Sequence, residues 1–332
     1  MLEHGGRLLA AARRHGIAPA AWLDLSTGIA PYGYPVPAIP PELWQRLPED
    51  EDDLSAIACR YYGARKVLAL PGSQAAIQLL PRLRPPGVVA VLEPSYAEYA
   101  AAWSAAGHAV RPCAVDALPL AAITANVVVI GNPNNPTGSC FSRRALLDMA
   151  RQLEARQGWL IVDEAFADAD NGGDSLADIA GTGVAGNIVV LRSIGKFFGL
   201  AGARVGFAIA CDSILTPLAE SIGPWALAHP SRFAARAALA DADWQSAQRA
   251  RLQRDGARLH ELLAASGLGT STGTALFRYQ ARDDALELHE FFARQGILLR
   301  YFARPAAVRF GLPATEAGWQ RLAATLDQWK NR

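Results

Sequence analysis

The chain has 332 residues, of which 51% are hydrophobic and 19% are charged. This length exceeds that of a usual single domain, so we expect one large domain with a smaller one, and the composition argues against long disordered segments. The 32 basic and 31 acidic residues almost cancel, which leaves no broad electrostatic field for nucleic acid or an anionic membrane as a partner.

The cysteines, the first residues and the lengths of the apolar runs indicate the compartment. Cys59, Cys113, Cys140 and Cys211 are scattered without metal-ligand spacing, and they form no disulfide framework. The first residues, MLEHGGR, lack the features of a secretory signal, and no apolar run reaches membrane-spanning length. We therefore expect a cytoplasmic protein with reduced thiols and no bound metal.

The first part of the chain is expected to form an arm ahead of the main sheet. Residues 7–23 carry a helix-like pattern, and residues 28–41 are rich in proline and glycine and should be extended. Residues 42–47 and 53–62 have the pattern of short helices.

From residue 67 onward, apolar segments typical of strands alternate with segments long enough for helices. The expected strands are 67–70, 88–92, 109–113, 126–130, 159–163, 187–192 and 204–210. Such alternation indicates an α/β fold with a mostly parallel mixed sheet between layers of helices.

After residue 212 the pattern changes to a smaller α+β domain. A long helical region runs from about 231 to 263, and the remaining expected elements are strands at 274–280, 297–302 and 306–311 with helices at 283–295 and from 315 to the end. We assign residues 1–41 to an N-terminal arm that contributes to the small domain, 42–215 to the large domain, and 216–332 to the small domain.

Two candidate ligand positions follow the first two strands. Gly72, Ser73 and Gln74 open a helix whose free backbone N–H groups can bind an anion, although Ser73 could equally be a plain helix cap. Tyr96, at the carboxyl end of the second strand, could offer a flat face to a planar ring or merely fill a gap between helix and sheet.

Two further strands end in polar side chains. The octapeptide GNPNNPTG at 131–138 places Asn135 where it could donate a hydrogen bond to a ligand oxygen. Asp163 ends the apolar run WLIV and would be costly to bury unless paired, either with a cationic ring nitrogen or with an arginine.

Lys196 lies in a glycine-rich connection between two expected buried strands, in the stretch SIGKFFGLAGARVG at 193–206. Desolvation there would lower the pKa of the ammonium group, as a Schiff-base lysine requires. A lysine whose stem lies along apolar surface while its charge reaches water would have the same surroundings in sequence.

Taken in chain order, these motifs resemble the pyridoxal-phosphate (PLP) enzymes of the aspartate aminotransferase fold, fold type I. The matching segments are GSQ at 72–74, PSY at 94–96, NPNNPTG at 132–138, DEAF at 163–166 and the lysine stretch at 193–206. The resemblance implies that Lys196 forms the Schiff base with PLP and later moves the proton, while Asp163 pairs with the pyridinium nitrogen.

The resemblance also implies the remaining ligand contacts. Asn135 would bond the ring 3-oxygen, and Tyr96 would stack on the ring. The cofactor phosphate would be held by Gly72, Ser73, Gln74, Ser193 and Arg204. Arg309, in the segment VRFG, matches the family's arginine for a substrate carboxylate, a group that a planar guanidinium suits.

The chain departs from the family pattern at two positions. Where many relatives have a tyrosine, Phe166 leaves the ring 3-oxygen without a hydroxyl donor, so we expect a more basic Schiff-base nitrogen. Where many have Arg-Tyr-Pro, with the tyrosine reaching the neighbouring subunit's cofactor phosphate, this chain has Arg46-Leu47-Pro48. A lost charge-assisted hydrogen bond of about 1.5–3 kcal/mol should weaken cofactor binding roughly ten- to a hundred-fold.

The ends of the chain resemble one branch of the family, the threonine-phosphate decarboxylases of cobalamin biosynthesis. The matching segments are HGG at 4–6, LSTGIAPYG at 25–33, DEAF at 163–166 and PW at 224–225. This branch converts L-threonine O-3-phosphate to (R)-1-amino-2-propanol O-2-phosphate. His4 and Arg300 are candidates for the substrate phosphate, although each could be an ordinary solvated side chain.

Two alternatives stay open at this point. The close relatives of this branch include histidinol-phosphate aminotransferases, so the reaction could be transamination. The chain could also be a catalytically weak subunit of the complex that attaches aminopropanol to the corrinoid. The family is generally dimeric, so we expect a homodimer, with a cobalamin-biosynthesis protein as a further possible partner.

Overall fold

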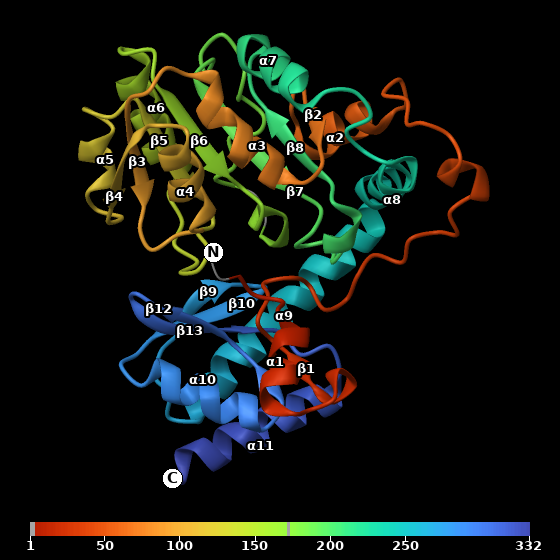
Figure 1. Ribbon diagram of the computed structural model, residues 1–332, viewed down its shortest axis with the longest axis vertical. Helices are drawn as coiled ribbons and strands as arrows, with labels where there is room; N and C mark the ends of the chain where they lie inside the picture. Colours follow the sequence, from red (N-terminus) through yellow and green to blue (C-terminus); the bar gives the residue numbers. More distant parts are fainter. Residues whose placement is uncertain (1–3, 171–172) are drawn as a thin grey trace. The chain divides into compact units, whose positions relative to one another are not determined.

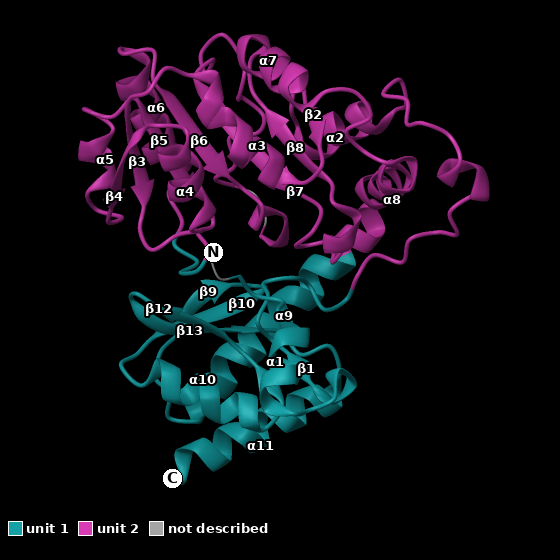
Figure 2. Cartoon of the chain, viewed as in Figure 1, with its two compact units in different colours: residues 1–32, 136–139, 247–332 teal, residues 33–135, 140–246 magenta. Residues whose placement is uncertain are grey.

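The computed structural model describes residues 4–170 and 173–332 (Figure 1). The chain divides into two compact units, which are coloured separately in Figure 2. Unit 1 comprises residues 1–32, 136–139 and 247–332, and unit 2 comprises residues 33–135 and 140–246. Within the described residues, no helix is both long and apolar enough to cross a membrane.

Unit 2 is built on a seven-stranded sheet with the order β2-β8-β7-β6-β5-β3-β4. The strands are β2 (Leu68–Leu70), β3 (Val88–Leu92), β4 (Ala109–Cys113), β5 (Val127–Gly131), β6 (Trp159–Asp163), β7 (Ile188–Ser193) and β8 (Gly206–Ile209). Strand β8 is antiparallel to both of its neighbours, and the other pairs are parallel. The expected mostly parallel mixed sheet is confirmed.

Helices of unit 2 cover the sheet because its inner strands are largely apolar on both faces, whereas the edge strand β4 is mostly exposed. The α-helices are α2 (Leu54–Tyr62), α3 (Ser73–Leu79), α4 (Glu98–Ala105), α5 (Leu118–Ala121), α6 (Arg143–Glu154), α7 (Asp212–Ile222) and α8 (His229–Ala240). Short 3-10 segments lie at Pro41–Trp44, Leu80–Leu83, Ala167–Ala169 and Ala201–Ala203.

Alternate residues of the strands pack against different helices. Val89, Val127 and Val189 share one buried cluster with side chains of α3, α4 and α7. Helix α6 packs on β6, and its buried Leu146 lies outside that cluster. Because side chains of a strand point alternately to its two faces, such burial requires the near-continuous apolar runs seen in the sequence.

Unit 1 contains a four-stranded antiparallel sheet with the order β12-β13-β10-β9. Its strands are β9 (Thr272–Thr274), β10 (Phe277–Ala281), β12 (Arg300–Ala303) and β13 (Ala306–Gly311), and a separate parallel pair joins β1 (Leu23–Asp24) to β11 (Ile297–Leu298). The helices are α1 (Leu8–His15), α9 (Ala242–Ala265), α10 (Ala285–Arg294) and α11 (Glu316–Lys330), with a 3-10 turn at Pro19–Ala21.

Three helical segments differ from expectation. The pattern over 7–23 forms α1, a 3-10 turn and β1, because α1 ends at Gly16 in the left-handed conformation. In place of a helix over 42–47 there is only the 3-10 turn Pro41–Trp44, which follows Pro40. The region 231–263 forms two helices, since the Asp241 carboxylate accepts the Trp244 N–H and so starts α9.

The division of the chain also differs from the expected boundary at 215/216. Helix α7 shares the buried cluster of α3, and α8 packs against α2, so both belong to unit 2. The segment after Gly33 joins unit 2 as well, where the Tyr34 N–H donates to the Phe198 carbonyl. The unit boundary therefore falls within α9, between residues 246 and 247.

Candidate active site

One row of the large sheet brings together the residues that are predicted to bind the cofactor phosphate. Gly206 of β8 is paired with Leu70 of β2 on one side and with Ser193 of β7 on the other. A Cβ atom on Gly206 would lie 2.4 Å from the Ser73 nitrogen, so only glycine fits between these strands. The turn after β2 and the end of β7 therefore meet around the start of β8.

The guanidinium of Arg204 lies against the turn that opens α3. A Cβ atom on Gly72 would be 2.6 Å from an Arg204 nitrogen, and Gly72 itself has a positive φ of 79°. Arg204 adopts a left-handed backbone with φ 54°, which is costly for a residue other than glycine. The result is a cation beside the backbone N–H groups of Ser73 and its neighbour, an arrangement that suits a phosphate.

The side chain of Gln74 is bonded within the protein. Its amide oxygen accepts from the Tyr96 hydroxyl at 3.0 Å, and its amide nitrogen donates to Glu98 at 3.1 Å. A contact of Gln74 with a phosphate would therefore use its backbone N–H or the second hydrogen of its amide. The pKa of Tyr96 is raised to about 12, first by burial and then by the charges of Glu98 and Asp163, so its hydroxyl keeps its proton.

Asp163 is a buried carboxylate held from two sides at the end of β6. One oxygen accepts the Ala165 N–H at 2.9 Å, and the other accepts the Tyr99 hydroxyl at 2.7 Å. Burial raises the pKa of Asp163, against the opposing effects of these two hydrogen bonds and of the Lys196 charge. A cationic partner at this carboxylate would offset the cost of its burial.

Tyr99 was not identified from the sequence. It lies three residues after Tyr96 in the PSYAEY segment, and the two rings meet edge to face with centroids 5.5 Å apart. Spacing of i, i+3 at the start of a helix places both side chains on one face, which was the available signal.

Lys196 lies in the turn after β7 and is half-buried. Its Nζ is 5.6 Å from the centre of the Phe166 ring, and its charge acts on Asp163. The turn thus places the amine within reach of the residues that end β6. The expected lowering of the Lys196 pKa stays a prediction.

The asparagines after β5 differ in their hydrogen-bond partners. Asn132 exchanges two hydrogen bonds with the backbone of Phe141, and the Asn134 amide donates to the Pro94 carbonyl at 2.9 Å. These two therefore fix the loop, and Asn135 follows them as a half-buried side chain.

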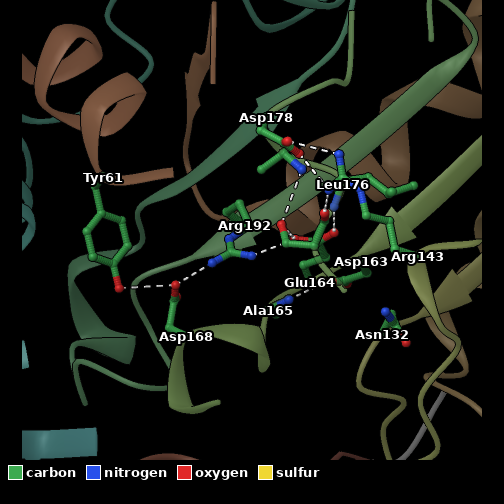
Figure 3. A network of polar contacts seen from close by, with 12 residues as sticks. Tyr61, Asn132, Arg143, Asp163, Glu164, Ala165, Asp168, Leu176, Asp178 and Arg192 are labelled. Carbon is green, nitrogen blue, oxygen red and sulfur yellow. Dashed lines mark hydrogen bonds and ion pairs between the residues drawn. The ribbon is translucent and has the colours of Figure 1, made fainter. Parts of the chain in front are cut away.

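A buried charge network lies next to Asp163, at the ends of β6 and β7 (Figure 3). Arg192 of β7 forms ion pairs with Glu164, at 2.6 Å, and with Asp168. Glu164 also accepts from the Ser175 hydroxyl, and Asp168 accepts from the Tyr61 hydroxyl at 3.2 Å. Since Glu164 follows Asp163 and Arg192 precedes Ser193, the network ties together the strand ends that carry the site.

The sequence analysis did not predict this network. Glu164 and Arg192 each stand at the end of an apolar strand, where a charge must be paired if it is buried. The sequence does not say which carboxylate pairs with which arginine, and only the β6–β7 register brings them together.

The substrate candidates lie in unit 1. Arg309 and Arg300 are direct partners across β12 and β13, and Arg309 donates to the Ser26 carbonyl at 3.0 Å. Burial, followed by the Arg300 charge, lowers the pKa of Arg309 to about 9. The Gly6 N–H donates to the Ser26 hydroxyl at 2.8 Å, so the segment that carries His4 also reaches Ser26.

The sequence-predicted residues thus form two groups. Those assigned to the cofactor lie at the carboxyl edge of the unit 2 sheet, and those assigned to the substrate lie on one segment and one sheet of unit 1. Among the described residues, no group of three or more His, Cys, Asp or Glu side chains could hold a metal ion.

Comparisons with known proteins agree with these features. A family model described as aminotransferase class I and II matches residues 50–327. A threonine-phosphate decarboxylase of Pseudomonas aeruginosa is 50% identical over 330 residues, covering 99% of this chain and 98% of that protein. A protein of the same name from a Sinorhizobium species is 42% identical, covering 98% of this chain and 97% of that one.

The fold also matches a solved structure. The histidinol-phosphate aminotransferase of Sinorhizobium meliloti, in complex with pyridoxal-5'-phosphate, superposes with a TM-score of 0.83 at 21% identity, covering 99% of this chain and 95% of that one. The family model spans most of the chain, and relatives match it along its full length. On these grounds the chain belongs to the class I and II aminotransferase family.

Proposed function

We propose that this protein is a PLP-dependent decarboxylase that converts L-threonine O-3-phosphate to (R)-1-amino-2-propanol O-2-phosphate in cobalamin biosynthesis. The observation that carries this proposal is the 50% identity, along 99% of the chain, to a protein named threonine-phosphate decarboxylase. Identity at this level over a full chain is where members of one enzyme family commonly share a reaction. The fold alone would not choose among PLP reactions.

The cofactor is pyridoxal 5'-phosphate, and the residues of unit 2 fit it. The Gly72 turn, which has room for no side chain beside Arg204, offers N–H donors and a cation to a phosphate. The buried Asp163 carboxylate suits a protonated ring nitrogen. Gly72, Ser73, the Gln74 backbone, Ser193 and Arg204 would hold the phosphate, with Asn135 and Tyr96 at the ring.

When bound, the cofactor supplies an electron sink for the bond that breaks at the substrate's α-carbon. The protein's own groups then have defined tasks. Asp163 keeps a negative charge in a buried place, and Tyr99 holds that carboxylate through a 2.7 Å hydrogen bond. Lys196, in the turn after β7, holds and moves the proton at Nζ, and its charge acts on Asp163.

The substrate has two anionic groups, and unit 1 offers two adjacent guanidinium groups. Arg309 is the proposed partner of the carboxylate, and Arg300, across the β12–β13 pair, is the proposed partner of the phosphate. His4, two residues before the Gly6 that bonds Ser26, is a further proposed partner of the phosphate. Paired arginines suit carboxylate and phosphate because their planar donors can bind both oxygens of a group.

The test is an assay of the purified, cofactor-loaded protein with threonine phosphate. We expect release of carbon dioxide and formation of aminopropanol phosphate. Transfer of the amino group to 2-oxoglutarate without carbon dioxide release would instead support a histidinol-phosphate-type aminotransferase. A Lys196→Ala variant that still supported corrinoid assembly would favour the non-catalytic subunit.

We also propose that the enzyme is a cytoplasmic homodimer. Trp44, Leu47 and Trp225 of unit 2 are more than half exposed, at 68%, 63% and 57%. They belong to one region, since the His229 ring bonds the Leu47 carbonyl at 2.8 Å and the Pro41–Trp44 turn packs against α8. Large apolar side chains gathered on a surface are typical of an interface. Sedimentation analysis of the holoenzyme measures the oligomeric state.

A further inference from the structure

The four-stranded sheet of unit 1 has one face committed to α10. Phe310 of β13 meets Phe292 of α10 with ring centroids 5.9 Å apart, and Tyr301 of β12 stacks on His289 of the same helix. Because successive strand residues point to opposite faces, Arg309 and Arg300 point away from α10. The proposed substrate cations therefore share the opposite face.

Tyr279 of β10 belongs to the same row as these arginines. It is the direct partner of Arg309 across β10 and β13, and Arg309 is in turn the partner of Arg300. Its ring meets Phe302, two residues after Arg300, edge to face with centroids 5.9 Å apart. Directly opposed residues on one face have Cβ atoms about 4.5–5.5 Å apart. A phenol and two guanidinium groups are thus presented side by side.

The hydroxyl of Tyr279 is buried without a hydrogen-bond partner among the described residues. The residue is 6% exposed, and its oxygen has lost contact with solvent. Burial raises the pKa of Tyr279, so the hydroxyl remains a donor at neutral pH. Buried hydroxyl groups in folded proteins are nearly always bonded, and an exception requires an explanation.

We propose that the Tyr279 hydroxyl is a further substrate contact, which donates a hydrogen bond to an anionic oxygen of the substrate held by Arg309 and Arg300. This inference rests on the proposed function, since it takes the substrate to be a phosphorylated amino acid. A phenol donor beside two cations completes an anion site without adding charge. On this proposal the Tyr279 hydroxyl has no partner within the protein because it donates to the ligand. A buried donor without a partner should lower the free energy of unfolding of the ligand-free protein.

The experiment compares Tyr279→Phe with the wild-type holoenzyme by titrating threonine phosphate against the absorbance of the bound cofactor. The variant keeps the ring against Phe302 and loses only the hydroxyl, so we expect substrate affinity to fall about 10- to 100-fold. Its ligand-free melting temperature should be equal to or above that of the wild type, and the shift caused by substrate should be smaller. The control is Tyr301→Phe, which removes a hydroxyl from the opposite face of the same sheet and should leave affinity unchanged.

A second ligand distinguishes the anionic groups. Aminopropanol phosphate keeps the phosphate and lacks the carboxylate. A loss of affinity for threonine phosphate alone assigns the hydroxyl to the carboxylate, and an equal loss for both ligands assigns it to the phosphate; either result supports the inference.

Three outcomes separate this inference from the proposed function. If the wild type itself fails to bind threonine phosphate, the proposed function is wrong and this inference falls with it. If the wild type binds and Tyr279→Phe binds equally well, only this inference is wrong. A ligand-free melting temperature clearly below the wild type's would mean that the hydroxyl is already bonded within the protein, which also overturns it.

Discussion

At the scale of single residues, the carboxylate of Asp163 depends on its hydroxyl donor. Tyr99 is buried, and its own pKa is raised well above the ordinary value, first by burial and then by the Asp163 charge. The tyrosine therefore stays protonated and always donates. Its bond is one of the effects that oppose the raised pKa of Asp163.

We predict that Tyr99→Phe weakens PLP binding about 10- to 100-fold, because a hydrogen bond to a charged group contributes about 1.5–3 kcal/mol. Loss of the donor raises the pKa of Asp163 further. On acidification the carboxylate then takes up its proton at a higher pH, and cofactor affinity should begin to fall at a higher pH than in the wild type. Absorbance titration of the apoenzyme with PLP, repeated across pH, measures both effects.

The control for this substitution is Tyr34→Phe. Tyr34 also donates to an aspartate at 3.3 Å, but that residue, Asp241, starts α9 and is not one of the predicted site residues. Its removal should leave the PLP dissociation constant unchanged. Equal losses in both variants would contradict a specific role for Tyr99.

At the scale of elements, the end of β6 is tied to β7 by buried charges rather than by apolar contacts alone. The side chain of Arg192 is 7% exposed, and the side chains of its partners Glu164 and Asp168 are 0% and 1% exposed. The guanidinium also lies over the Tyr62 ring, 4.6 Å from its centre. An ion pair so placed contributes little net stability, but removing one partner leaves a buried charge uncompensated.

We predict that Arg192→Met lowers the free energy of unfolding by about 3–5 kcal/mol, because two buried carboxylates lose their cation. Urea titration followed by circular dichroism measures this change. The matched control, Arg143→Met, breaks the more exposed Arg143–Asp178 pair seen in the same view (Figure 3) and should cost about 1 kcal/mol or less. Similar losses in the two variants would show that burial of the Arg192 network has no special cost.

A second link between elements joins the segment before α2 to α8. The Asp52 carboxylate accepts from Arg232 at 2.8 Å, and Arg232 is 3% exposed. Burial acts to raise the pKa of Asp52, but hydrogen bonds from Arg232 and the Leu54 N–H outweigh it, so the pKa lies below the ordinary value. The stability from this link is thus fully present above the ordinary aspartate pKa and is lost as the pH falls through the lowered one.

We therefore predict that Asp52→Asn lowers the free energy of unfolding by about 1.5–3 kcal/mol at pH 7. The difference from the wild type should shrink as the pH falls from roughly 4, the ordinary aspartate pKa, through the lowered pKa of Asp52, where the folded wild type loses this charge. Urea titrations at a series of pH values measure the difference. Glu49→Gln, which removes an exposed partner of Arg46, is expected to cause no comparable change, and a pH-independent effect of Asp52→Asn would refute the linkage.

At the scale of the whole molecule, the proposed homodimer makes Leu47 informative. The family resemblance implies that a tyrosine at this place would reach the neighbouring subunit's cofactor phosphate, and Leu47 is 63% exposed in the single chain. We predict that Leu47→Tyr tightens PLP binding about 10- to 100-fold, because it restores a hydroxyl donor to the phosphate. The PLP dissociation constant of the apoenzyme measures this gain.

Leu47→Phe provides the comparison, since it adds the ring without the hydroxyl and should leave the PLP dissociation constant near the wild-type value. A gain equal to that of Leu47→Tyr would mean that ring packing is the cause. No gain in either variant, with a dimer seen by sedimentation, would mean that position 47 does not reach the phosphate.

Much of the architecture followed from local patterns. Each expected strand of the large sheet is present within two residues of its predicted ends, as for the exact match of β3 at Val88–Leu92. The inner strands β3, β5, β6, β7 and β8 are buried on both faces, so their sequences had to be largely apolar, and the signal was strong. The break at Asp241 and the assignment of α7 and α8 to unit 2 were missed, because caps and helix docking depend on partners distant in sequence.

The sequence by itself determined the family, the cofactor and the chemical types of the site residues. Lys196, Asp163 and Arg204 lie in motifs whose spacing is set by strand and turn lengths, which are local properties. Only the tertiary structure showed which of the predicted site residues also form hydrogen bonds within the protein. The side chain of Gln74 bonds to Tyr96 and Glu98. The Arg192 network and the row of Tyr279 beside Arg309 exist only through strand register. The physical reason is that a hydrogen bond or ion pair needs two residues close in space, and these pairs are distant in sequence.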